Sequence, residues 1–317
     1  MKALNLVPAD VDIAFIAKRK LFFAFSAVMI MASVALTFTQ GLNFGIDFKG
    51  GILIEVRTEG PADIGQMRDK LSTLGLGDIS LQEFGEVTDV LIRIQRQPGG
   101  DEAQQHAVNA VKGALEENVQ YRRTEFVGPQ VSAELLEDGI MAVSLAILAI
   151  LVYIWFRFEW QFGVGAVIAL VHDVATTIGI FALMGFEFNL STVAAVLTIA
   201  GYSINDTVVV YDRVREKLRK FKTMPLPELL NLAINKTLSR TIVTSLTTLL
   251  ALLALFFLGG EVIRDFSFAM IWGVLIGTYS SICIAVPLLM YFGLDDKARG
   301  NLAGDDDEDA VAEPDAS

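Results

Sequence analysis

Residues 190–211 read LSTVAAVLTIAGYSINDTVVVY, and this stretch determines the architecture of the chain. Most of it is apolar, and its polar side chains gather between Ser203 and Thr207. About 20 mostly apolar residues are enough for a helix to cross the roughly 30 Å of hydrocarbon in a bilayer. The stretch therefore predicts a membrane-spanning helix that carries an aspartate, Asp206, inside it.

Five further apolar runs of similar length predict five more spans, so the chain is expected to be a polytopic α-helical membrane protein with six transmembrane helices. The first run follows Lys18-Arg19-Lys20 as the core of a signal peptide would. It is longer than such a core and no clear cleavage site follows it, so we interpret it as a retained anchor. The five runs are Leu21–Thr39, Gly139–Phe156, Phe162–Phe186, Thr241–Leu258 and Phe266–Phe292.

The basic residues of the short loops predict the orientation, because cytoplasmic loops carry an excess of lysine and arginine. The flank before the first span and the loop between the fourth and fifth spans are rich in them, whereas the loop at 187–189 has none. We therefore expect residues 1–20 and the acidic tail 295–317 to be cytoplasmic, and residues 40–138 to lie outside the membrane on the other side. The tail is a block of like charges that is expected to be disordered. The remaining five spans then form a membrane domain at 139–294.

The outer segment, 40–138, alternates strand and helix patterns. Strands are expected at 52–57, 79–84, 90–95 and 121–127, and helices at 61–74 and 101–118. The order β-α-β-β-α-β is the ferredoxin-like arrangement of an α+β domain. That fold occurs in many unrelated proteins, so it predicts no function by itself.

Composition excludes several classes of protein. The chain has 317 residues, 53% of them hydrophobic, with a formal net charge of −12. An acidic chain lacks the basic face that nucleic acid requires, so nucleic acid is not expected as a partner. With a single cysteine, Cys283, and two histidines, neither a disulfide nor a multi-histidine metal site is expected. No phosphate-binding loop or nucleophile elbow is found, so we expect no cofactor and no enzyme activity.

Charged side chains inside the spans are the candidate functional residues, because a charge in hydrocarbon costs at least about 2.5–3.5 kcal/mol. Asp206, beside Asn205, is the strongest. A carboxylate there is either a proton carrier or a structural hydrogen-bonding residue. Low polarity favours the protonated form of the group and a nearby cation favours the ionised form, so the two together can let it bind and release a proton. Arg240, at the start of the fifth span, is either the counter-charge to Asp206 or an anchor reaching the lipid headgroups.

A second candidate pair, His172 and Asp173, lies near the middle of the third span. Neighbouring residues on a helix point in different directions, so a direct contact between these two side chains is not expected. One of them is expected to face another helix. For His172 the alternative is a histidine buried in the core with its hydrogen bonds satisfied.

Three segments resemble the motifs of the SecD/SecF family of protein-export membrane proteins, which belongs to the resistance-nodulation-division superfamily. They are FGIDFKGG at 44–51, VGPQVS at 127–132, and AGYSINDTVVVYDR at 200–213 followed by LSRT at 238–241. The resemblance covers about residues 16–294. The single short outer segment is similar to the smaller of the two family subunits.

The resemblance implies a half-transporter that pairs with SecD in the bacterial inner membrane, with residues 40–138 periplasmic. It implies association with the SecYEG channel and use of the proton motive force to promote late export of unfolded polypeptides. The family's proton-transport residues match Asp206 and Arg240. Two other functions stay open: an ion-driven exporter of small molecules, and a structural scaffold without ion transport. The coupling ion, H⁺ or Na⁺, also stays open.

Overall fold

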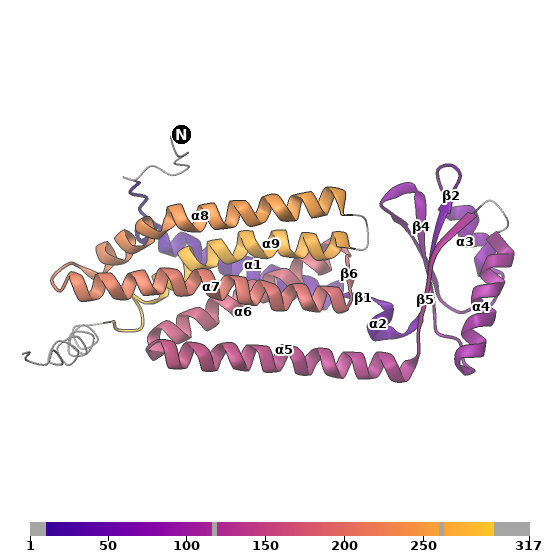
Figure 1. Ribbon diagram of the computed structural model, residues 1–317, viewed down its shortest axis with the longest axis horizontal. Helices are drawn as coiled ribbons and strands as arrows, with labels where there is room; N and C mark the ends of the chain where they lie inside the picture. The colour runs from indigo at the N-terminus through magenta and orange to yellow at the C-terminus, as the bar shows by residue number, and fades with distance from the viewer. Residues whose placement is uncertain (1–10, 116–118, 260–262, 295–317) are drawn as a thin grey trace, which may run out of the picture.

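The computed structural model describes residues 11–115, 119–259 and 263–294. A bundle of long helices occupies one part of the molecule, and a β-sheet flanked by two helices lies beyond one end of it (Figure 1). In the described residues six helices are long and apolar enough to cross a membrane, which agrees with the six predicted spans. The acidic tail, 295–317, lies outside the described residues.

The helices of the second, fourth and fifth spans extend well beyond the predicted bounds, chiefly where polar residues continue a helix into water, whereas the third ends at Met184, before the predicted Phe186. The fourth helix does not end at Tyr211, because Val214 and Leu218 bury their side chains against the bundle and continue the helical register. The fifth begins well before Thr241, at Leu226, with Pro227 in its first turn, where proline is tolerated. The helices are α1 Arg19–Thr39, α5 Pro129–Arg157, α6 Trp160–Met184, α7 Leu190–Lys220, α8 Leu226–Leu258 and α9 Arg264–Ser280.

The last helix changes its geometry inside the bundle. After Ser280 the chain forms a π-helical turn, Ser281–Ala285, and a short helix, Val286–Leu288. Pro287 has no backbone N–H to donate to a regular helical ladder, and π-turns often lie at functional sites. This irregular turn is completely buried.

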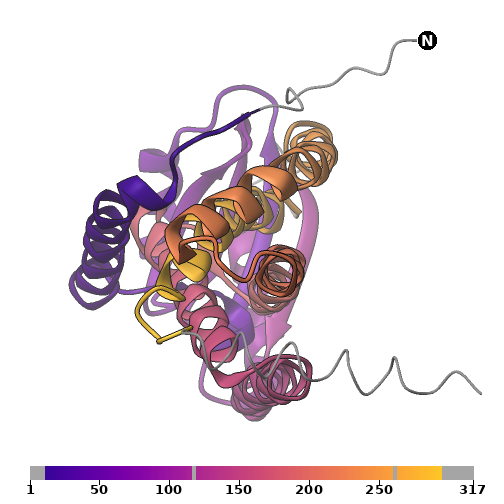
Figure 2. The same cartoon turned by 90° about the vertical axis from the view of Figure 1, so that its left-hand side faces the viewer.

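Helices α6, α7 and α9 form the centre of the bundle, whereas α1 and α5 lie at its periphery (Figure 2). In α9 72% of the span is buried within the chain, but in α1 and α5 only 11% and 6%. Helices α7 and α9 approach closely where Gly277 of α9 faces Ser203 of α7. Small residues allow such close packing of membrane helices. The apolar outer faces of α1 and α5 remain free for lipid or for another subunit.

The outer domain has the predicted order β-α-β-β-α-β. Its four antiparallel strands lie in the sheet order β3-β4-β2-β5. The two helices cover one face of the sheet, where Ile52, Ile54 and Val111 form a fully buried core (Figure 1). The elements are β2 Gly51–Thr58, α3 Ile64–Ser72, β3 Ile79–Phe84, β4 Glu86–Ile94, α4 Gly100–Leu115 and β5 Val119–Val127.

Three short elements between the two parts have no counterpart in the prediction. They are β1 Asn43–Phe44, α2 Ile46–Lys49 and β6 Glu187–Phe188. Strands β1 and β6 pair in parallel, so the segment after α1 is bound to the loop between α6 and α7. Two-residue strands leave no periodicity in the sequence, which explains why they were not expected.

A buried carboxylate on the outer sheet makes the stability of the outer domain depend on pH. Arg57 donates to both oxygens of Asp89 at 2.5 Å, and Arg122 donates to it at 3.3 Å. These bonds, that of Arg57 first, hold the pKa of Asp89 below its ordinary value. Because the pKa is lowered in the folded state, the stabilisation is complete above the ordinary aspartate pKa of about 4 and is lost as the pH falls through the lower value.

We therefore expect the melting temperature of the outer domain to fall below about pH 4, and the fall to be smaller in Asp89→Asn. Calorimetry of the whole chain in detergent between about pH 6 and about pH 3 measures this. Glu83→Gln, an exposed change on the neighbouring strand β3, is the control and should keep the wild-type pH dependence. Identical curves for Asp89→Asn and the wild type would contradict the assignment.

Candidate functional site

Helix α7 carries one of the two carboxylates that are buried in the described part of the bundle, Asp206, among several buried hydroxyl groups. Its N-terminus is fixed by a capping box between Asn189 and Thr192, which satisfies free backbone N–H groups. A short cluster of polar residues then interrupts its apolar sequence. Ser203, Asp206 and Thr207 are buried, whereas Asn205 is exposed on the surface of the single chain.

Asp206 lies where α7 packs against α8. Its side chain is buried, with a residue exposure of 8%, and its Oδ1 accepts a hydrogen bond of 2.9 Å from the hydroxyl of Thr241. Its other oxygen, Oδ2, is buried and has no hydrogen-bond donor among the described residues. The lone pairs of such a carboxylate oxygen remain available to bind a proton or a small cation.

Arg240, the residue before Thr241, is exposed at the surface of the chain. Among the described residues no ion pair joins it to Asp206. The hydrogen-bond partner of Asp206 is instead Thr241, which the sequence analysis did not single out. A β-branched hydroxyl residue following the arginine in LSRT was the only signal for it. The role of Arg240 as a counter-charge stays a prediction.

Asp173 is the second buried carboxylate, and it joins three helices. Its Oδ2 accepts hydrogen bonds from Ser203 of α7 at 2.5 Å and from Ser280 of α9 at 2.7 Å. Its Oδ1 lies 2.9 Å from Nδ1 of His172. Asp173 itself is on α6 and has no exposed surface. The carboxylate therefore links α6, α7 and α9 at the centre of the bundle.

The expectation that His172 and Asp173 do not touch is wrong. The side chains of neighbouring helical residues do leave the backbone in different directions. Nδ1 of the histidine, however, lies near its Cβ, and the aspartate side chain is short, so the two polar groups meet close to the backbone. Both side chains are almost completely buried, so each gains from a polar partner within the protein. The second nitrogen of His172, Nε2, is buried and has no hydrogen-bond partner among the described residues.

The hydroxyl groups around these carboxylates extend the polar centre further. Thr207 and Ser281 share a hydrogen bond of 2.8 Å, and the Ser281 hydroxyl also donates to the backbone oxygen of Ser203 at 3.4 Å. Ser280 and Ser281 lie where α9 changes into the π-helical turn. The sequence analysis missed these serines, although a Ser-Ser pair inside an apolar run was a visible signal. In the described part of the chain no group of three or more acidic, histidine or cysteine side chains could hold a metal ion.

Six helices able to span a membrane define a multi-pass membrane protein, and buried carboxylates among them, Asp173 and Asp206, are typical of ion-transporting bundles. Similarity to known proteins identifies the family of membrane proteins to which the chain belongs. Residues 107–295 match the family model for the protein export membrane protein SecD/SecF, C-terminal, and residues 35–62 match the SecD/SecF GG motif. The chain therefore belongs to the SecD/SecF family of protein-export membrane proteins, and its function lies in protein export.

Individual relatives agree with this assignment. The chain is 48% identical to the protein translocase subunit SecF of Rickettsia rickettsii (strain Sheila Smith), over 91% of this chain and 94% of that protein. It is also 48% identical to the protein translocase subunit SecF of Rhodobacter capsulatus, with 92% of each chain covered.

A solved structure is similar over nearly the whole chain. The crystal structure of SecDF, a translocon-associated membrane protein from Thermus thermophilus, matches with a TM-score of 0.83 and 37% identity over 92% of this chain. The match covers 40% of the length of that SecDF chain. A second SecDF structure, in a super-membrane-facing form, matches with a TM-score of 0.65 and 34% identity, over 93% of this chain and 41% of that one.

Proposed function

We propose that this chain is the smaller half of a proton-driven export motor in the bacterial inner membrane. It pairs with SecD, works beside the SecYEG channel, and promotes the late export of unfolded polypeptides. Support comes from the relatives, which are named as translocase subunits, and from the SecDF structure, in which a similar chain accounts for less than half of a longer one. It has no enzyme activity of its own and uses no cofactor.

The orientation that we propose follows the basic residues. Both ends of the chain are cytoplasmic, and residues 40–138 form a periplasmic domain. The distribution of lysine and arginine supports this orientation, because the α7–α8 loop and the flank before α1 are basic. The loop between α6 and α7, on the side of the outer domain, contains no basic residue.

Asp206 is the proton-carrying group of the motor. The observation that supports this role is its buried Oδ2, which has no donor among the described residues although the opposite oxygen is hydrogen-bonded. Asn205 and Arg240 are exposed near it on α7 and α8, where a second subunit can cover them. In this arrangement Arg240 acts as a movable counter-charge, and its approach or withdrawal controls whether Asp206 holds its proton.

The energy available limits what the motor does. One charge moved through about 100 mV provides about 2.3 kcal/mol. This is enough to shift a helix bundle between two packings, but it is less than the roughly 5–15 kcal/mol that keeps a typical domain folded. The substrate is therefore already unfolded, and the motor prevents it from sliding back.

Proton flux through vesicles that contain the SecD-paired complex tests the proposal. We expect Arg240→Ala to lose most of the proton flux while still co-purifying with SecD and SecYEG. Normal flux in this variant would exclude Arg240 as the counter-charge, whereas a wild-type complex with no more flux than empty vesicles would favour the structural scaffold. Failure to co-purify with SecD or SecYEG, combined with normal flux, would favour the small-molecule exporter. Replacing the proton gradient by a sodium gradient distinguishes the coupling ion.

A further inference from the structure

Two short segments hold the outer domain to the outer end of the helix bundle, and we call them together the clasp: Asn43–Lys49 and Gly185–Leu190. Strand β1 pairs in parallel with β6, so that Asn43 lies opposite Glu187 and Phe44 opposite Phe188. The Asn43 side chain donates to the backbone oxygen of Gly185 at 3.0 Å, and the Gly45 N–H donates to the backbone oxygen of Phe188 at 3.0 Å. The first segment leads into the outer sheet, and the second leads into α7.

Gly45 permits this close approach. A Cβ atom at this position would lie 3.2 Å from the Cβ of Asn189 and would collide with the side chain of Glu187. A larger residue would therefore displace the carboxylate of Glu187 from its place beside Gly45. The aromatic rings of Phe44, Phe48 and Phe188 pack edge to face or tilted around the same point, with centroids 5.9 to 6.1 Å apart.

Asp47 connects the first segment directly to the helix that carries Asp206. Its Oδ2 accepts a hydrogen bond of 3.0 Å from the backbone N–H of Leu190, the first residue of α7. A carboxylate at this end also interacts favourably with the positive end of the helix dipole. A shift of α7 along its axis therefore moves the group to which Asp47 is bound.

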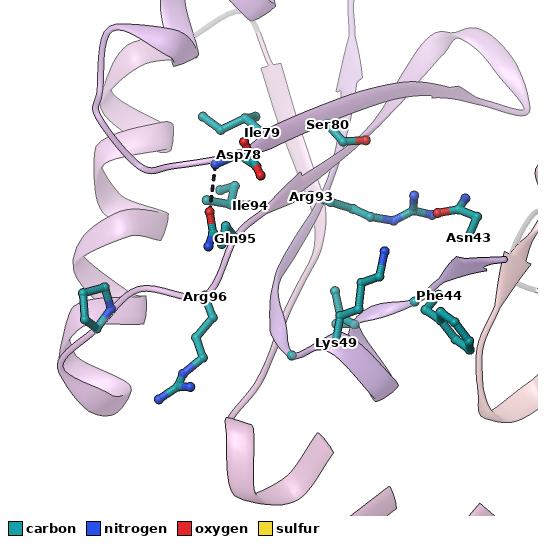
Figure 3. A pocket seen from close by; sticks show the side chains of 14 residues that line it. Asn43, Phe44, Lys49, Asp78, Ile79, Ser80, Arg93, Ile94, Gln95 and Arg96 are labelled. Atoms are coloured by element: carbon teal, nitrogen blue, oxygen red, sulfur yellow. Dashed lines mark hydrogen bonds between the residues drawn. The ribbon is translucent and has the colours of Figure 1, made fainter. Parts of the chain in front are cut away.

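A partly buried ion pair connects the sheet to the second segment. Arg93 of β4 pairs with Glu187 of β6, and both side chains are only 15% exposed. The backbone N–H of Glu187 in turn donates to Asp265 of α9 at 3.2 Å. In Figure 3 the Arg93 side chain runs from the sheet toward Asn43, and Lys49 rises from α2 beside it. Arg93 thus links β4 to the loop between two central helices.

Beside the clasp lies a cavity of about 890 Å³, lined in part by Asn43, Lys49, Arg93 and Arg96 (Figure 3). On this side open space separates the first clasp segment from strands β3 and β4. The same segment also packs on the sheet through Ile46, which is buried with Leu53 and Leu91. The contacts of Asp47 and Arg93 can be changed one at a time without removing a side chain from this apolar cluster.

We propose that the clasp is the link through which the state of α7 reaches the outer domain, with Asp47 and Arg93 as positioning residues. The inference rests on the proposed proton-driven function. The covalent connections through α1 and α5 are poorer candidates for this link, because those helices are peripheral and bury little surface against the rest of the bundle. The clasp instead ties the outer domain to α7 and to the loop before it by side-chain contacts at both Asp47 and Glu187.

The test exchanges the charges of the ion pair in the full chain, reconstituted with SecD and SecYEG. Arg93→Glu and Glu187→Arg, made singly, should lower proton-dependent stimulation of export at least about fivefold, which is within the range of measured coupling changes. Proton flux should stay within about twofold of the wild type, because Asp206 is untouched. The double variant Arg93→Glu/Glu187→Arg should recover the stimulation.

Arg123→Glu is the matched control, because Arg123 forms an ion pair with Glu125 on the same sheet away from the clasp. It should leave both export and flux unchanged. Normal stimulation in both single variants would overturn the proposal. A parallel loss of flux and stimulation would also overturn it, because the clasp would then only stabilise the bundle. The proposed function fails separately, if Asp206→Asn keeps its proton flux.

Asp47 provides a second measurement for the case in which the Arg93 variants do not accumulate. Asp47→Ala removes the acceptor for Leu190, whereas Asp47→Asn keeps a carbonyl oxygen in the same place. We expect stimulation to fall about fivefold in Asp47→Ala and to recover at least half in Asp47→Asn, with proton flux preserved in both. Equal stimulation in Asp47→Ala and the wild type would overturn the role of Asp47.

Discussion

Asp206→Asn is expected to reduce proton flux through the SecD-paired complex to the level of empty vesicles, and to abolish proton-dependent stimulation of export. The amide has nearly the same size and keeps an oxygen that can accept the 2.9 Å hydrogen bond from Thr241. It cannot take up or release a proton at physiological pH. The packing of α7 on α8 should therefore survive while the chemistry is lost. Export measured in proteoliposomes with and without a proton gradient gives the result.

Three variants make this prediction specific. Asp206→Glu retains the ionisable group and should keep measurable flux. Thr198→Val changes an exposed residue on the same helix whose hydroxyl bonds to the backbone oxygen of Ala194, and it should keep both flux and assembly. Thr241→Val removes the hydroxyl that donates to Asp206 with little change in volume, so it should alter the pH dependence of flux rather than abolish it. Wild-type stimulation in Asp206→Asn would exclude Asp206 as the proton carrier.

The number and positions of the spanning helices were largely predictable because the membrane imposes a simple rule. Spanning helices need long apolar runs, and all six such runs are helices in the structure. The same rule identified Asp206 and Asp173, since a carboxylate in hydrocarbon is expensive and therefore rare. Helix ends were harder to predict. Beyond Tyr211 the chain is polar, and the burial of Val214 and Leu218 keeps α7 helical.

The contacts that could not be predicted are side-chain hydrogen bonds between segments far apart in the sequence. Nothing in the sequence near Ser280 indicates that its hydroxyl reaches Asp173, 107 residues earlier in the chain. The bond between Asp47 and Leu190 is equally remote. Serine and threonine are common in membrane helices, and many bond only to their own backbone, as Thr177 does. Their use as cross-helix donors is visible only in three dimensions.

Asp173→Ala is expected to destabilise the bundle by about 2–5 kcal/mol, because it leaves the hydroxyls of Ser203 and Ser280 and the ring of His172 without their acceptor. A hydrogen bond between membrane helices contributes on average about 0.6 kcal/mol, which gives about 1 kcal/mol for the bonds from Ser203 and Ser280. The Ser203 hydroxyl and the His172 ring, left unpaired in a buried site, each add about 1 kcal/mol or more. Ser280 keeps a second acceptor, the backbone oxygen of Gly277 at 3.1 Å. Unfolding of the purified chain in detergent by added denaturant measures the difference.

The chain offers a matched control in Thr177, which lies on the same helix and is almost equally buried. Its hydroxyl bonds to the backbone oxygen of Asp173, within α6, so Thr177→Val should cost less than about 1 kcal/mol. Asp173→Asn keeps one acceptor for the serines and should fall between the two. A double variant with Ser280→Ala should cost less than the sum of the single changes, because both remove the same bond. Asp173→Ala with wild-type stability would contradict the structural role, and Asp173→Asn with full stability but no proton flux would make Asp173 a second ion carrier.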